Sequence, residues 1–141
     1  MENDRYLIRI EASMLLDVDL YRGGNSKIPR LENVRDKDII KYKDPDTGLT
    51  MVKGMSGGIS TFSCPKPEKN WYWIKAGTVV PSKLTFTRDR SDPGTKITHY
   101  TIRPSDDMLL SEYIEQMQKI TSIEKLTLEK AISLAERWIN K

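Results

Sequence analysis

The sequence predicts an α+β domain, in which a strand-rich first part is followed by a helical tail. Residues 1–103 are rich in Gly, Pro and Thr and contain short runs of alternating apolar and polar residues, as β-strands do. Residues 104–141 contain no Gly, and no Pro after Pro104, and their apolar residues recur at helical spacing. A chain of 141 residues can close one hydrophobic core, so we predict a single domain spanning residues 1–141.

The first part predicts short strands separated by turn residues. The earliest is Val18–Arg22, which ends at two glycines. Five more runs of β-branched, aromatic and aliphatic residues predict further strands: Leu49–Val52, Ile59–Phe62, Asn70–Ile74, Leu84–Thr87 and Lys96–Ile102. The last two flank Arg88–Gly94, whose turn chemistry predicts a hairpin. Around Asp36–Lys41 we expect a short helix, whereas the apolar positions of residues 1–16 follow neither period.

The tail predicts two amphipathic helices that pack on or beside the sheet. Ser105 is a suitable cap for the first helix, whose apolar face is formed by Leu110, Tyr113, Ile114 and Met117. Thr121 and Glu124 form a capping-box pattern for the second. Its apolar stripe consists of Leu128, Ala131, Ile132, Ala135, Trp138 and Ile139.

Composition excludes several classes of protein. Hydrophobic residues make up 38% and charged residues 30% of the chain, a globular balance that argues against disorder. No apolar run approaches the roughly 20 residues of a membrane-spanning helix, and Met1–Arg5 lacks the character of a signal peptide. We therefore expect a protein made in the cytoplasm, with no membrane insertion. The net charge of +3 is too small to indicate nucleic-acid binding.

The chain contains one cysteine, Cys64, and one histidine, His99, which limits its chemistry further. A single cysteine forms no internal disulfide, and Cys64 has no base near it in the sequence that would make it a catalytic thiol. A structural zinc site needs about four nitrogen or sulfur ligands, more than these two residues provide. Asp44 and Asp46 suit magnesium or calcium but sit in a plain turn, so we expect no metal at the functional site.

Two features in the first half of the chain are suited to binding an anion. Arg22 ends a strand just before two glycines, where its guanidinium can hold a phosphate or diphosphate by two-point hydrogen bonding; the alternative is a surface arginine. The loop Gly54–Phe62 contains Gly57-Gly58, whose backbone N–H groups can form an anion nest; the alternative is a tight turn. This loop matches neither the phosphate-binding loop nor the nucleophile elbow.

Two further features lie on predicted strands. His99 shares a strand face with Ile97 and Thr101, and histidine suits proton transfer or ligand orientation near neutral pH; the alternative is a structural histidine. Trp71 and Trp73 share a face of another strand, where they can stack on an aromatic ligand or pack in the core.

Together, the order of these motifs resembles one family. The chain reads Leu20-Tyr21-Arg22-Gly23, then Asp46-Thr47-Gly48-Leu49, Gly57–Phe62, Ile74–Pro81 and Thr98–Pro104. This order and spacing, from about Leu20 to Met108 with a helical tail, resembles the small ADP-ribosyltransferase-like toxins of bacterial type VI secretion. These toxins are NAD-dependent cytostatic effectors whose producers carry an immunity protein. The likeness rests on order and spacing, because no single motif is specific.

The resemblance implies a fold, a substrate and a set of site residues. The fold is a pair of split, strongly bent sheets with flanking helices, and NAD is the substrate, bound in the cleft between them without a metal. Arg22, Ser60 and His99 match the family's functional positions and are expected to be catalytic, with His99 orienting the ribose or assisting the leaving-group step. The expected NAD-binding residues are Tyr21, Arg22, Gly23, Gly58, Ser60, Thr61 and Tyr100.

One departure leaves the reaction open. Many ADP-ribosyltransferases use a glutamate on a late strand, but Lys96–Ile102 contains no acidic residue, and Glu112 and Glu115 fall on a predicted helix. Transfer of ADP-ribose to a macromolecule, hydrolysis of NAD and a non-enzymatic binding module therefore stay open, in that order of preference. The resemblance also implies a cognate immunity protein, a carrier from the secretion apparatus and delivery into the cytoplasm of a target cell.

Overall fold

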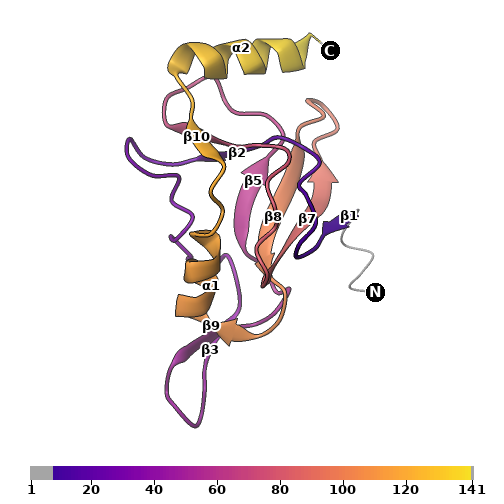
Figure 1. The fold of residues 1–141 in the computed structure, drawn as a ribbon. Helices are drawn as coiled ribbons and strands as arrows, with labels where there is room; N and C mark the ends of the chain where they lie inside the picture. Colours follow the sequence, from indigo (N-terminus) through magenta and orange to yellow (C-terminus); the bar gives the residue numbers. More distant parts are fainter. Residues whose placement is uncertain (1–7, 141) are drawn as a thin grey trace.

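A computed structural model describes residues 8–140 and confirms the α+β class, with ten strands in two antiparallel sheets and two helices (Figure 1). Residues 1–7 and Lys141 belong to the predicted single domain 1–141 but lie outside the described residues. Within residues 8–140, every helix is too short or too polar to cross a membrane. The early apolar positions take different roles, since Ile8–Ile10 forms a strand, Leu16 is buried and Leu15 is exposed.

The large sheet has the strand order β1-β7-β8-β5-β2-β6-β10, with antiparallel neighbours throughout. Its strands are β1 (Ile8–Ile10), β2 (Leu20–Gly23), β5 (Ile59–Phe62), β6 (Trp71–Ile74), β7 (Leu84–Ser91), β8 (Thr98–Pro104) and β10 (Ile123–Lys125). The predicted hairpin is confirmed, because β7 pairs with β8. Its strands are longer than expected, and Arg88–Ser91, predicted as turn, belongs to β7.

The small sheet consists of β3 (Lys41–Lys43), β4 (Thr50–Val52) and β9 (Met108–Leu109). The predicted helix around Asp36–Lys41 is wrong, since residues 36–38 form a turn and Lys41 pairs with Val52 in a strand. The Asp38 carboxylate accepts a hydrogen bond from the backbone N–H of Arg35 at 2.9 Å, which closes the turn locally. Pairing of β3 with β4 then satisfies the backbone N–H and C=O groups of the residues from Lys41 onward, which in a helix would have bonded to one another.

The tail contains two helices, α1 (Leu110–Met117) and α2 (Leu128–Ile139), but also two short strands that we did not predict. Ser105 does not cap α1, because its hydroxyl is 2.8 Å from the Thr85 hydroxyl and its N–H donates to Lys83 beside β7. Thr121 does not cap α2 either. Thr127 does, accepting a hydrogen bond from Lys130 N at 3.1 Å.

One large hydrophobic core joins the two sheets and α1. Tyr113 and Met117, on the predicted apolar face of α1, are fully buried. The sheets contribute further buried members of this core, among them Val52, Ile59, Ile74, Leu84, Phe86, Ile102 and Met108. A buried residue in such a core contributes about 1.5–3 kcal/mol by leaving water, so α1 is held chiefly by these two side chains.

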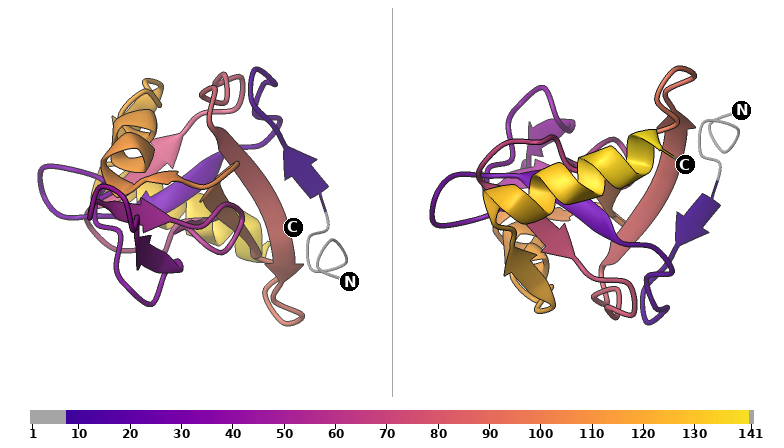
Figure 2. Two further views of the ribbon diagram at one scale, coloured as in Figure 1. Left: turned by 90° about the horizontal axis from the view of Figure 1, so that it is seen from below. Right: turned by 90° about the horizontal axis from the view of Figure 1, so that it is seen from above.

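The helix α2 lies at the end of the molecule away from the small sheet, and the view from above shows it crossing the large sheet (Figures 1 and 2). Its inner face is narrow, with Ala131 and Ala135 buried and Leu134 packed partly against a second, smaller core. That core contains Tyr21 and Trp71. Near its end, Trp138 Nε1 donates a hydrogen bond to Thr95 O at 2.7 Å, which ties α2 to the turn of the β7–β8 hairpin.

Candidate functional site

The antiparallel pairing of β5 with β8 brings Ser60 and His99 together. Phe62 lies opposite His99, and Ser60 opposite Thr101, so all four side chains share one face of the sheet. His99 Nε2 is 3.0 Å from Ser60 Oγ. The Phe62 ring meets the imidazole edge-on, with ring centroids 5.3 Å apart, and so fixes its orientation. Two of the three predicted catalytic residues are therefore in direct contact.

A third residue, Asp89, completes the contact and was missed in the sequence. Its Oδ2 is 2.9 Å from His99 Nδ1 on the opposite side of the ring from Ser60. Burial acts to raise the Asp89 pKa, but hydrogen bonds from His99, Thr101 and Thr87 and the charge of Arg103 lower it to about 2. We placed Asp89 in a turn. The signal that could have found it is alternation, because Thr85, Thr87 and Asp89 recur at strand spacing.

His99 lines a pocket of about 500 Å³, which we call the His99 pocket. The lining residues come from the large sheet and its loops, and none comes from the small sheet: Phe62, Cys64, Lys66, Trp71, Arg90, Ser91, Asp92, Pro93, Thr95, Ile97 and His99. Trp71 is largely buried and packs edge-on against Phe62 at 6.3 Å, so it belongs to the core and to the pocket wall. Two exposed cations, Lys66 and Arg90, stand at the rim.

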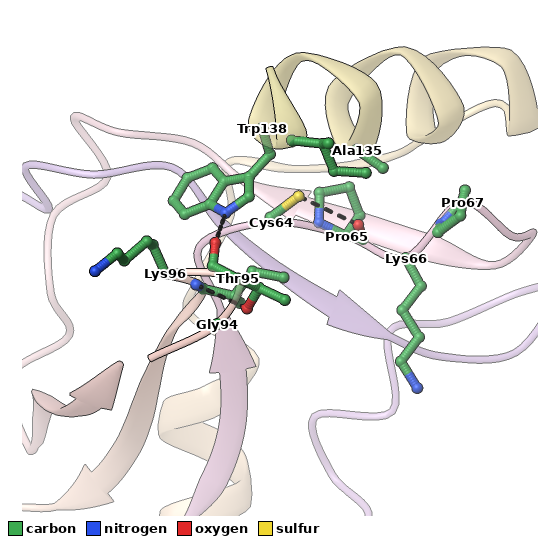
Figure 3. A pocket seen from close by; sticks show the side chains of 11 residues that line it. Cys64, Pro65, Lys66, Pro67, Gly94, Thr95, Lys96, Ala135 and Trp138 are labelled. Atoms are coloured by element: carbon green, nitrogen blue, oxygen red, sulfur yellow. Dashed lines mark hydrogen bonds between the residues drawn. The ribbon is translucent and has the colours of Figure 1, made fainter. Parts of the chain in front are cut away.

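A second pocket of about 800 Å³ adjoins the first beneath α2 (Figure 3). The two pockets share Cys64, Lys66, Thr95 and Ile97. The close-up shows Trp138 of α2 reaching down to Thr95, with Cys64 and Pro65 facing them. The Cys64 thiol is buried and contacts the backbone carbonyl of Pro65, as expected of a small structural side chain. Together the two pockets form an extended hollow along one end of the large sheet.

Arg22 lies next to Ser60 but is engaged with the backbone. Its guanidinium donates to Ser60 O at 2.9 Å, Pro29 O at 3.1 Å and Arg30 O at 3.1 Å. Burial lowers its pKa, and the nearby charge of Asp38 acts in the opposite direction. Arg22 does not line the His99 pocket. In this structure it joins the loop after β2 to the strand that carries Ser60.

The predicted glycines lie against protein rather than open space. A Cβ atom on Gly58 would stand 2.0 Å from Ile102 O, and one on Gly23 would touch the Trp71 ring at 3.5 Å. The N–H of Gly58 donates to Asp38 O at 2.9 Å, so this donor of the expected anion nest is used within the protein. Gly58 therefore permits β5 and β8 to approach closely.

The remaining predicted residues lie away from His99. Thr61 is fully buried and donates to Tyr100 O at 3.2 Å, and Tyr100 belongs to the main core. Tyr21 and Tyr100 both line another pocket of about 490 Å³, where Arg88 also lies. Burial raises the pKa of Tyr21 to about 12 and also raises that of Tyr100, so both phenols stay neutral near pH 7. The structure thus joins His99 to Ser60 and, through the Ser60 carbonyl, to Arg22, but not to Tyr21 or Tyr100.

The arrangement can move a proton. An imidazole held between a carboxylate and a hydroxyl, at the wall of a pocket with aromatic and cationic groups, suits acid–base work on a bound ligand. Over residues 8–140, no three His, Cys, Asp or Glu side chains gather as metal ligands.

Comparison with known proteins supplies the reaction class. A search of curated protein sequences finds no match. The model of one protein family, described as Tse2 ADP-ribosyltransferase toxin, matches residues 19–127. The match includes β2, β5, β7 and β8 and therefore Arg22, Ser60, Asp89 and His99; it ends just before α2. Since it covers most of the chain, the protein belongs to the Tse2 family of ADP-ribosyltransferase toxins.

Proposed function

We propose that this toxin uses NAD as the donor of ADP-ribose and transfers the group to a macromolecule of a competitor cell, with His99 and Ser60 at the reacting end. The observation that carries the proposal is the position of this pair. His99 lines a pocket of about 500 Å³, and its Nε2 lies 3.0 Å from the Ser60 hydroxyl. The family gives the reaction class, and the pair gives a group that can take up or deliver a proton within it.

The wall of the His99 pocket suits NAD. Phe62 and Trp71 offer aromatic surface to a flat ring, and the exposed cations Lys66 and Arg90 suit a diphosphate. The adjoining pocket of about 800 Å³ is lined by Lys96 and the Trp138 ring, among others. It gives room for the part of NAD that extends beyond the His99 pocket. We assign the reacting end of the donor to the His99 pocket and the remainder to the adjoining hollow.

The residues then have distinct roles. NAD supplies a bond between the ribose C1′ carbon and nicotinamide, and the electron pair of that bond leaves with nicotinamide. His99 Nε2 takes up the proton that the acceptor loses as its oxygen or nitrogen bonds to C1′. Ser60 orients the ribose hydroxyls. Arg22 holds the Ser60 backbone through its bond to the carbonyl at 2.9 Å. Acid–base catalysis of this kind contributes about 10²–10⁴-fold.

A toxin with this activity endangers the cell that makes it. We propose that a cognate immunity protein covers the opening of the His99 pocket, and that a carrier from a type VI secretion apparatus delivers the toxin into the cytoplasm of the target cell. The cations at the pocket rim, Lys66 and Arg90, favour an acidic surface on the immunity protein.

The test is incubation of the purified protein with NAD labelled separately in its nicotinamide and adenylate parts, with and without a bacterial lysate. We expect nicotinamide release and adenylate label on a lysate macromolecule. His99→Ala and Ser60→Ala should each reduce both signals at least about 100-fold. Ser111→Ala, which changes an exposed serine of α1, is the matched control and should behave as wild type.

The outcomes separate the candidate reactions. Nicotinamide release without label on a macromolecule would replace transfer by NAD hydrolysis while keeping the donor. Folded wild-type protein that leaves NAD intact in both conditions would refute the use of NAD. Full activity of both site variants would refute the site.

A further inference from the structure

Asp89 owes its position to an irregularity in the β7–β8 hairpin. The two strands pair in register up to Arg88, opposite Tyr100, and resume at Arg90, opposite His99. Asp89 is therefore the extra residue of a β-bulge, the device that re-aims a side chain and that often lies beside functional sites. Here it directs a carboxylate toward His99 Nδ1.

Four polar side chains surround this carboxylate. Oδ1 accepts from Thr87 Oγ1 at 2.7 Å and from Arg103 Nη2 at 3.1 Å. Oδ2 accepts from Thr101 Oγ1 at 2.5 Å and faces His99 Nδ1 at 2.9 Å. A carboxylate offers about four lone-pair sites, so Asp89 has none left for a substrate.

The charge of Asp89 decides which nitrogen of the neutral His99 ring carries the proton. The side chain is 9% exposed and its pKa is lowered to about 2, so it is an ionised, acceptor-only group near pH 7. A hydrogen bond between it and His99 Nδ1 then requires the proton on Nδ1. In a neutral imidazole this leaves the lone pair on Nε2, which faces the Ser60 hydroxyl at 3.0 Å.

We propose that Asp89 is the positioning residue of this site: it holds His99 as the Nδ1–H tautomer and so makes Nε2 the base directed toward Ser60 and the pocket. The proposal deepens the proposed function and rests on it for the reaction itself. The carboxylate acts through the imidazole, whose ring it orients and whose charge it stabilises when Nε2 takes up a proton. It does not touch the ribose. This separates Asp89 from a glutamate that contacts the sugar directly.

The experiment uses the full chain and exploits the fact that it contains one histidine. Protein labelled with nitrogen-15 at His99 gives a single pair of ring signals, and long-range proton–nitrogen spectra near pH 7.5 identify the nitrogen that carries the proton. We expect it on Nδ1 in wild type and redistributed in Asp89→Asn and Asp89→Ala. Asp46→Asn, which alters an exposed carboxylate in the turn before β4, should leave the wild-type pattern unchanged.

Turnover of NAD is the second measurement. Asp89→Asn should lower kcat about 100-fold or more with little change in KM, because the base is misdirected while the pocket wall is kept. The proposal is overturned if neutral wild-type His99 carries its proton on Nε2, or if the Asp89 variants keep the Nδ1–H tautomer. Both outcomes are measured in the proton–nitrogen spectra and need no enzymatic activity. The expected tautomers in a protein that leaves NAD intact would instead refute the proposed function and keep the role of Asp89.

Discussion

Single side chains in this protein join segments that lie far apart in the sequence, and Arg22 is the clearest example. Its three hydrogen bonds end on the carbonyls of Pro29, Arg30 and Ser60. The sequence alone suggests that an arginine before two glycines holds a phosphate. The fold instead brings three carbonyls within its reach, and a charged donor used in this way stabilises the loop after β2.

Replacing Arg22 should therefore affect stability as well as activity. Hydrogen bonds to charged groups contribute about 1.5–3 kcal/mol each, and partial access of water reduces the sum, so we expect Arg22→Ala to lower the free energy of unfolding by about 2–4 kcal/mol. Arg90→Ala, an exposed arginine at the pocket rim, should change it by less than about 0.5 kcal/mol. Urea denaturation compares the two variants. Equal stability of Arg22→Ala and wild type would contradict the structural role.

The site was partly predictable residue by residue. Alternation in the predicted strands placed His99 and Thr101 on one face, and both contact Asp89 Oδ2. The resemblance added Ser60. Asp89 keeps the strand spacing of Thr85 and Thr87 but was missed, because Asp92-Pro93-Gly94 drew the predicted turn too far toward the N-terminus. The bulge that brings Asp89 beside His99 has no signal in the sequence pattern.

At the scale of elements, local patterns predicted strands better than they predicted the tail. Ile59–Phe62 was predicted residue for residue, since Gly57-Gly58 precedes the strand and Ile59 and Thr61 are β-branched. The tail was predicted to contain two helices and no strand, because it lacks glycine, yet Ile123–Lys125 pairs with β6. Pairing with an existing sheet edge outweighs the capping-box pattern of Thr121 and Glu124, and no local signal reveals that the edge is there.

The helix α2 lies beyond the matched residues 19–127 and is joined to the β7–β8 hairpin by the hydrogen bond from Trp138 Nε1 to Thr95 O at 2.7 Å. Thr95 belongs to the turn that walls both pockets. Trp138→Phe keeps most of the ring and removes the donor. We expect faster hydrogen exchange in residues 92–97 and a several-fold higher KM for NAD, with kcat unchanged.

Trp73→Phe is the matched control, since it removes an indole bond to Asp19 Oδ1 at 2.9 Å that lies outside both pockets. It should alter neither the exchange of residues 92–97 nor KM. If both variants raise KM equally, the effect comes from general loosening of the fold, and α2 does not shape the pocket through Trp138.

At the scale of the whole molecule, ionised carboxylates join elements that hydrophobic burial alone does not hold in register. Asp107, just before β9, accepts hydrogen bonds from Tyr42 Oη of β3 and from Gly54 N in the loop after β4. It therefore joins the small sheet to the loop after β4. Asp89 ties the β7–β8 hairpin to Thr101 and Arg103. The pKa of Asp107 is lowered mainly by its hydrogen bond from Tyr42, and that of Asp89 falls to about 2 against the opposing effect of burial.

These lowered values predict the response of the fold to acid. A carboxyl whose pKa is lower in the folded state contributes stability above its unfolded pKa, near 4, and loses that contribution as the pH falls to the folded value. For Asp89, the difference between 3.8 and about 2 corresponds to about 2 kcal/mol, lost between pH 4 and 2. Asp89→Asn lacks this titration, so its stability should change less over the same interval than that of wild type. Urea denaturation at pH 6, 4, 3 and 2 gives both curves. Parallel curves for the two proteins would mean that the pKa of Asp89 is the same in the folded and unfolded states, so that its hydrogen-bond partners would not stabilise the ionised carboxylate.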